Sequence, residues 1–105
     1  MDLAVDSYRL TRSFPKEEIY GLSSQLRRSA ASIAANIAEG YGRESTGAYI
    51  QALRVAQGSL KETETHILLA ERLEFITSDQ SGSILKFCDE IGRMLRSLIR
   101  SLQSE

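Results

Sequence analysis

The 105-residue chain has few of the residues on which several common protein classes depend. It contains no tryptophan, one proline, one cysteine and one histidine. A single cysteine excludes an intrachain disulfide. No run of eighteen apolar residues occurs, so no membrane span is predicted. The first residues lack the basic and apolar regions of a secretory signal, which predicts a cytoplasmic protein.

Composition places the chain among ordinary globular proteins. Apolar residues make up 42% and charged residues 26%, and the length suits one domain covering residues 1–105. The net charge is −1. Proteins that coat nucleic acid are usually basic as a whole, so any contact with nucleic acid depends on where the arginines gather.

The apolar pattern repeats every three or four residues, which is the helical period. No segment alternates with the period of a strand. We predict an all-α protein, an antiparallel up-down-up-down four-helix bundle whose first helix is short or truncated. The apolar stripes of the expected helices run over residues 3–10, 22–41, 47–73 and 84–102.

Glycines and polar residues predict the helix boundaries. Gly40 and Gly42 are expected to end the second helix as C-terminal glycines do, and residues 77–82 read as a polar turn. Gly58 lies inside the third helix, where glycine costs about 1 kcal/mol relative to alanine. We therefore expect the alanine-rich face of the second helix to approach closely at Gly58.

Arginines form the clearest charged pattern. Arg93, Arg96 and Arg100 follow the spacing i, i+3, i+7 and share one face of the last helix. The bundle topology brings Arg43 and Arg54 to the same end of the molecule. The stripe is a solvated helix face, a phosphate-contacting surface or a subunit interface.

Polar residues within the second and third helices suggest a network between them. Asn36 and Glu39 accompany the apolar stripe of the second helix. Buried polar groups need partners, so a cross-helix network would fix the register of two smooth helices; otherwise these groups are simply exposed. The candidate pairs are Arg28 with Glu62 or Glu64, and Asn36 with Ser59.

Catalytic and metal-binding patterns are weak. His66 follows Glu62 by four residues, but Thr63 occupies the position that a Glu-x-x-His bundle site requires, and there is no second histidine. Neither a nucleophile elbow nor a phosphate-binding loop occurs. Cys88 shares an apolar stripe with Ile84 and is expected in the core. We predict no catalytic residues, metal, cofactor or small-molecule substrate, and hence no enzyme.

Two blocks of sequence resemble the bacterial 23S ribosomal RNA intervening-sequence proteins: residues 13–40, with Ser13-Phe14-Pro15-Lys16-Glu17-Glu18 and Asn36-Ile37-Ala38-Glu39-Gly40, and residues 56–65. The resemblance implies a four-helix bundle that assembles as a homopentamer. It also implies kinship with accessory proteins of diversity-generating retroelements, in which a basic pentamer binds nucleic acid. The family's longer, aromatic-rich first helix is absent, so an internal start or a truncated helix is expected.

Two functions remain. The first is a non-enzymatic oligomeric module that binds RNA or a ribonucleoprotein, with Arg43, Arg54, Arg93, Arg96 and Arg100 as its contacts. The second is an oligomeric scaffold or protein-interaction module with no nucleic-acid role. The first predicts an affinity that falls steeply with salt, and the second predicts exposed apolar patches.

Overall fold

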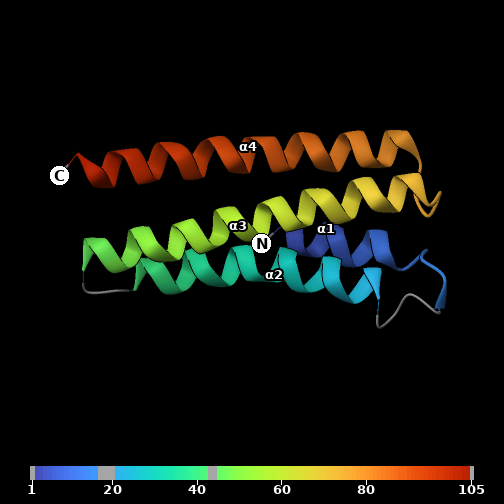
Figure 1. The fold of residues 1–105 in the computed structure, drawn as a ribbon, viewed down its shortest axis with the longest axis horizontal. Helices are drawn as coiled ribbons and strands as arrows, with labels where there is room; N and C mark the ends of the chain where they lie inside the picture. The colour runs from blue at the N-terminus through green and yellow to red at the C-terminus, as the bar shows by residue number, and fades with distance from the viewer. Residues whose placement is uncertain (1, 17–20, 43–44, 105) are drawn as a thin grey trace.

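The computed structural model describes residues 2–16, 21–42 and 45–104. Successive helices run in opposite directions (Figure 1), so the predicted all-α four-helix bundle is confirmed. The molecule is elongated, with extents of 46 × 23 × 17 Å. Its helices are α1 (Asp2–Thr11), α2 (Leu22–Tyr41), α3 (Thr46–Arg72) and α4 (Ser78–Gln103).

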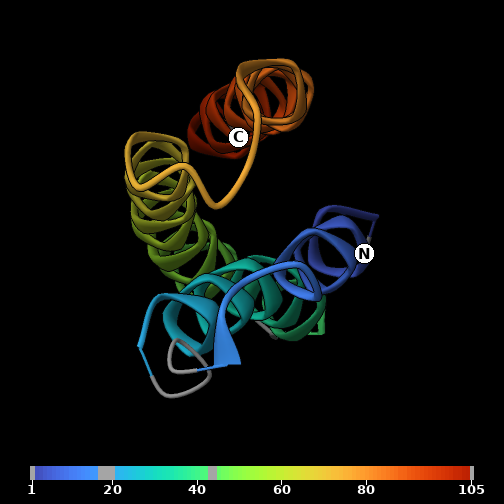
Figure 2. The same cartoon turned by 90° about the vertical axis from the view of Figure 1, so that its right-hand side faces the viewer.

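The helices pack mainly against their neighbours in the chain. The most extensive interface joins α2 to α3, followed by α3 with α4 and α1 with α2, whereas α1 and α4 meet over a small area. Among the described residues, no Cα atom of α2 lies within 8 Å of one in α4. Figure 2 shows this arrangement end-on, with α4 standing apart from α2.

The core follows the apolar stripes seen in the sequence. Leu26 of α2, Leu53 and Ile67 of α3, and Leu95 of α4 are fully buried. Cys88 is also fully buried and belongs to this cluster, which confirms its expected core position. At one end of the bundle, the rings of Phe14 and Phe75 lie 5.3 Å apart and join the segment after α1 to the α3–α4 turn.

The start of α4 corrects one sequence prediction. Residues 77–82 were expected to form a polar turn, but α4 already begins at Ser78. The backbone N–H of Gln80 donates to Thr77 Oγ1 at 3.1 Å, and the backbone N–H of Thr77 donates to Gln80 Oε1 at 2.9 Å. This reciprocal capping box satisfies free N–H groups of the first turn, so the polar residues start the helix rather than delay it.

The close approach expected at Gly58 occurs at Gly40 instead. Gly40 lies within α2, where an added Cβ would approach Tyr49 Cδ1 to 2.8 Å and Ala52 Cβ to 2.9 Å. At Gly58 an added Cβ would have nothing within 4 Å, so the expected close approach there is wrong. Gly42 does cap α2, but with a right-handed φ of −85°. The essential small residue is therefore Gly40, which admits the start of α3.

The described helices include none that is both long and apolar enough to cross a membrane.

Candidate nucleic-acid interface

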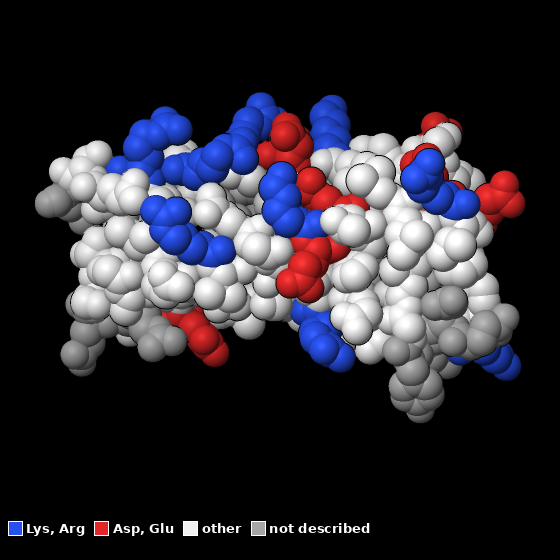
Figure 3. All heavy atoms as spheres, viewed as in Figure 1, with Lys and Arg blue, Asp and Glu red and all other residues white. Residues whose placement is uncertain are grey.

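The exposed arginines gather where the second half of α4 lies beside the first half of α3. Arg54, Arg93, Arg96 and Arg100 are all exposed. Gln57 of α3 and Arg96 of α4 line the same groove. Arg54 lies one helical turn before Gln57 and Arg100 one turn after Arg96, so in these antiparallel helices both lie toward the same end of the bundle. Figure 3 shows Lys and Arg spheres concentrated over this half of the visible face. Arg43, the fifth predicted contact, lies outside the described residues.

Neighbouring groups hold two of these arginines differently. Arg93 forms an ion pair with Asp89 at 3.2 Å, with side chains 64% and 67% exposed. Such a solvated pair contributes little to stability and leaves the guanidinium accessible to other anions. The Arg96 side chain lies back over Gly92. A Cβ atom added to Gly92 would be only 3.3 Å from Arg96 Nη1. Arg96 thus lies at the edge of the α3–α4 groove.

The groove between α3 and α4 has a volume of about 660 Å³. Gly58 leaves its α3 wall open, because a Cβ added there would meet nothing within 4 Å, whereas one added at Gly92 on the α4 wall would lie 3.3 Å from Arg96 Nη1 and 3.4 Å from Leu60 Cδ2. Its edge carries Lys61 and Glu64, which lie 4.0 Å apart, as well as Asp89 and Arg96. The remaining lining residues are Gln57, Leu60, Leu68, Leu85 and Cys88.

The base of the groove carries no charge at neutral pH. Burial, with a further contribution from the negative charge of Glu64, raises the pKa of the Cys88 thiol to about 12. Cys88 therefore stays protonated and behaves as a small apolar residue. Leu60 beside it is almost fully buried. The groove combines an apolar base with a charged edge.

Hydroxyl and amide groups join α2 to α3 on the other side of α3. Ser32 and Ser59 share a hydrogen bond across the two helices at 2.9 Å. Asn36 Nδ2 donates to Ser32 O at 2.8 Å and to Ser32 Oγ at 3.1 Å. Asn36 therefore connects to Ser59 through Ser32. The sequence pattern had predicted a direct pair between Asn36 and Ser59.

A second link lies one turn further along. Thr63 Oγ1 donates to Ser29 Oγ at 2.8 Å, and both residues are buried. Ser29 Oγ in turn donates to the Leu26 carbonyl at 3.1 Å. Ser29 and Ser32 face Ser59 and Thr63 at helical spacing, so polar residues recurring inside an alanine-rich stripe were the signal for this connection.

The charged residues assigned to the network lie elsewhere. Arg28, Glu39 and Glu62 are exposed, and Glu64 lines the α3–α4 groove. Within the described residues no ion pair joins Arg28 to Glu62 or Glu64. The connection between α2 and α3 is built from neutral hydroxyl and amide groups, which lose less hydration free energy on burial than charges do.

Comparison with known proteins establishes the family. The family model for 23S rRNA-intervening sequence proteins matches residues 1–97. The chain belongs to this family. It is also similar to a solved protein of unknown function from Bacteroides thetaiotaomicron, assigned to the S23 ribosomal protein family. The two are 33% identical over 93% of this chain and 92% of the other, with a TM-score of 0.84. No curated protein matches the chain.

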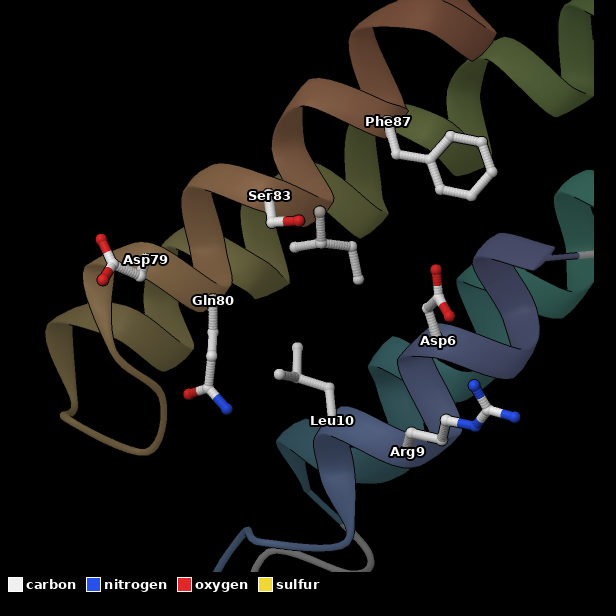
Figure 4. Close-up of a pocket in the computed structure, with 8 residues that line it drawn as sticks. Asp6, Arg9, Leu10, Asp79, Gln80, Ser83 and Phe87 are labelled. Atoms are coloured by element: carbon white, nitrogen blue, oxygen red, sulfur yellow. The ribbon is translucent and has the colours of Figure 1, made fainter.

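This family member has a second hollow, between α1 and α4, with a volume of about 730 Å³. Figure 4 shows Leu10 of α1 opposite Gln80 and Ser83 of α4, with Phe87 further along. Asp6 and Arg9 place opposite charges on its α1 side. The hollow lies at the first half of α4 and is lined by none of Arg93, Arg96 and Arg100.

The titratable residues of α3 do not converge on a metal site. Over residues 2–16, 21–42 and 45–104, no three His, Cys, Asp or Glu side chains are grouped closely enough to hold a metal ion. His66 is half-buried on α3, and Glu62, one turn before it, is exposed. These two residues have no further ligand beside them in the described part of the chain.

Proposed function

We propose that the protein is a non-enzymatic, oligomeric, cytoplasmic RNA-binding module that acts alone or within a ribonucleoprotein. The observation that supports it is the exposed surface formed by Arg54, Arg93, Arg96 and Arg100, which we call the arginine surface. Acidic residues slightly outnumber basic ones in the whole chain, which has a net charge of −1. Four arginines nevertheless lie on the adjoining halves of α3 and α4, the part of the visible face where Lys and Arg gather (Figure 3). Guanidinium groups suit phosphate contacts.

Assembly would extend this surface, because equivalent arginines of several subunits could contact one RNA. Exposed apolar side chains are available for an oligomer interface: Leu69 of α3 and Leu73 just after it, Met94 of α4, and Tyr41, which is 80% exposed. Apolar side chains mark protein–protein contacts where they gather into a patch, and Leu69 and Leu73 lie one helical turn apart at the end of α3. The homopentamer implied by the sequence resemblance is the assembly that we propose.

The test replaces Arg93, Arg96 and Arg100 with alanine in one variant. RNA affinity is measured by fluorescence anisotropy at several salt concentrations, with wild-type protein beside it. The variant should bind more weakly. The slope of log K against log salt should become shallower by about 2, because each lost phosphate contact on single-stranded RNA removes about 0.7.

The matched control removes three exposed cations from the other part of the bundle, Arg12, Arg72 and Lys86. It changes the net charge by the same amount, so it separates the effect of overall charge from that of the arginine surface. The control should retain the wild-type salt slope. Equal losses in the two variants, or an affinity that does not respond to salt, would contradict the proposal.

A protein-interaction module is the second candidate, and the exposed apolar residues Leu68, Leu69 and Leu73 at the end of α3 favour it. It predicts that the native oligomer retains a protein partner at high salt and binds no RNA at low salt. Identifying the protein and nucleic acid that co-purify with the native oligomer at both salt concentrations distinguishes the two functions.

A further inference from the structure

The α3–α4 groove lies next to the arginine surface and differs from it chemically. Arg54, Arg93 and Arg100 offer cations to solvent, whereas the groove offers an apolar base and two carboxylates at its edge. Phosphates need only the cations. The carboxylates and the apolar base need a ligand that has both a flat apolar face and hydrogen-bond donors.

A nucleobase has these properties. A volume of about 660 Å³ lies within the usual range for small-ligand sites and admits a base with its ribose. Bases in single-stranded RNA can leave the stack and enter pockets, where arginine guanidinium planes stack on them. Arg96 lies at the groove edge, where its guanidinium can reach a base or the adjoining phosphate.

Glu64 is the better placed of the two hydrogen-bond acceptors. Its side chain is 29% exposed and lies at the groove edge, with Lys61 Nζ 4.0 Å away. Asp89 is 67% exposed, and its ion pair with Arg93, at 3.2 Å, is closer than the 4.0 Å pair of Glu64 with Lys61. Carboxylates accept hydrogen bonds from the exocyclic amino group of cytosine. Uracil carries a carbonyl oxygen at that position and would face the carboxylate with an acceptor.

We infer that the α3–α4 groove is a nucleobase site that takes one unstacked base of a bound single-stranded RNA. Glu64 accepts a hydrogen bond from the amino group of this base, and Arg96 contacts its ring face or the adjoining phosphate. The inference rests on the proposed RNA-binding function and adds base selection to it. The groove favours cytosine over uracil, while Arg93 and Arg100 hold phosphates without regard to sequence.

The experiment measures the affinities of the full chain for labelled oligocytidine and oligouridine of equal length. Wild-type protein should bind oligocytidine more tightly by about fivefold or more, which is the level at which one good base contact discriminates. Replacing Glu64 with glutamine should bring the ratio close to one, because an amide can pair with either base. Glu62→Gln is the matched control. Glu62 is exposed and does not line the groove, so this variant should keep the wild-type ratio.

A second pair of variants tests the space in the groove and leaves its charged residues unchanged. Gly58→Leu should reduce the preference for cytosine and leave the salt slope unchanged, since the phosphate contacts remain. Gly58→Ala is its control, because a Cβ at this position meets nothing within 4 Å. Both substitutions replace a glycine in a helix interior, which favours the helix. Circular dichroism checks that both variants fold.

The outcomes separate the two proposals. Salt-sensitive binding that is equal for oligocytidine and oligouridine would overturn the nucleobase site and leave the RNA-binding function standing. A preference for cytosine that survives both Glu64→Gln and Gly58→Leu would also overturn the site. Failure to bind either oligonucleotide at low salt would overturn the RNA-binding function and the nucleobase site together.

Discussion

Thr63 and Ser29 form a 2.8 Å hydrogen bond between two buried hydroxyl groups, one from α3 and one from α2. The surrounding stripes consist largely of alanine and leucine, which do not distinguish one helix register from the next. A shift of α3 along α2 would separate this pair and the Ser32–Ser59 pair together. The two hydroxyl pairs therefore favour one register, a use of buried polar groups that is better established than stabilisation.

Removing the Thr63 hydroxyl should destabilise the protein. Thr63→Val keeps the side-chain shape but removes the buried bonds from Thr63 Oγ1 to Ser29 Oγ and to the Ser59 carbonyl, which should cost about 1–2 kcal/mol of unfolding free energy. Urea denaturation measures the loss. Thr65→Val is the control, because the Thr65 hydroxyl bonds only its own helix and is exposed. Equal midpoints for the two variants would contradict a structural role for the Thr63–Ser29 bond.

Alanine should have opposite effects at Gly40 and Gly58. Gly40→Ala places a Cβ 2.8 Å from the Tyr49 ring and 2.9 Å from Ala52. We expect a loss of about 1–3 kcal/mol, the usual cost of overpacking. Gly58→Ala adds a methyl group in open space and should stabilise α3 by up to about 1 kcal/mol. Thermal unfolding of both variants tests this contrast, and a stabilised Gly40→Ala would refute the close approach of α2 and α3.

The buried thiol of Cys88 should make stability depend on alkaline pH. Its pKa is raised from 9.0 to about 12 in the folded protein, so the folded state favours the protonated thiol. The full contribution is present below pH 9. It falls as the pH rises from about 9 toward 12, because the unfolded chain releases the proton first. Comparing urea midpoints of wild type and Cys88→Ala across this range isolates the effect. Parallel pH profiles would show that the thiol does not contribute.

The capping box at Thr77 should contribute measurably to α4. Thr77→Ala removes the oxygen that accepts from the Gln80 amide at 3.1 Å, and N-cap losses of this kind cost about 1 kcal/mol. Urea denaturation measures the loss, with Thr46→Ala as a control just inside the first turn of α3. Ser45, rather than Thr46, caps that helix through the Ala48 amide.

The helices themselves could be predicted, because a period of three to four apolar residues is local information. The second apolar stripe was predicted over residues 22–41, and α2 spans Leu22–Tyr41. The start of α4 was harder, since Ser78, Asp79 and Gly82 are residues that favour turns. Only the reciprocal bonds between Thr77 and Gln80 distinguish a helix start from a turn.

Relations between helices were less accessible from the sequence. The sequence does not distinguish Gly40 from Gly58 as the point of close approach, because that point depends on how α2 and α3 cross in space. The stripe Arg93, Arg96, Arg100 was visible, yet the groove beside it was not, because its walls come from residues about thirty positions apart. The roles of Ser32 as the partner of Ser59 and of Thr63 as the partner of Ser29 were missed for the same reason.

The packing of each helix on its neighbours in the chain also indicates which part of the bundle can unfold first. Because α4 packs chiefly on α3, and no Cα atom in the described part of α2 lies within 8 Å of one in α4, α4 can detach while the α2–α3 hairpin keeps its hydroxyl bonds. Amide hydrogens of α4 should then exchange through a local opening of lower free energy than that of the hairpin. The α3–α4 groove exists only while α4 is packed against α3. It is therefore among the first features lost when the protein partially unfolds.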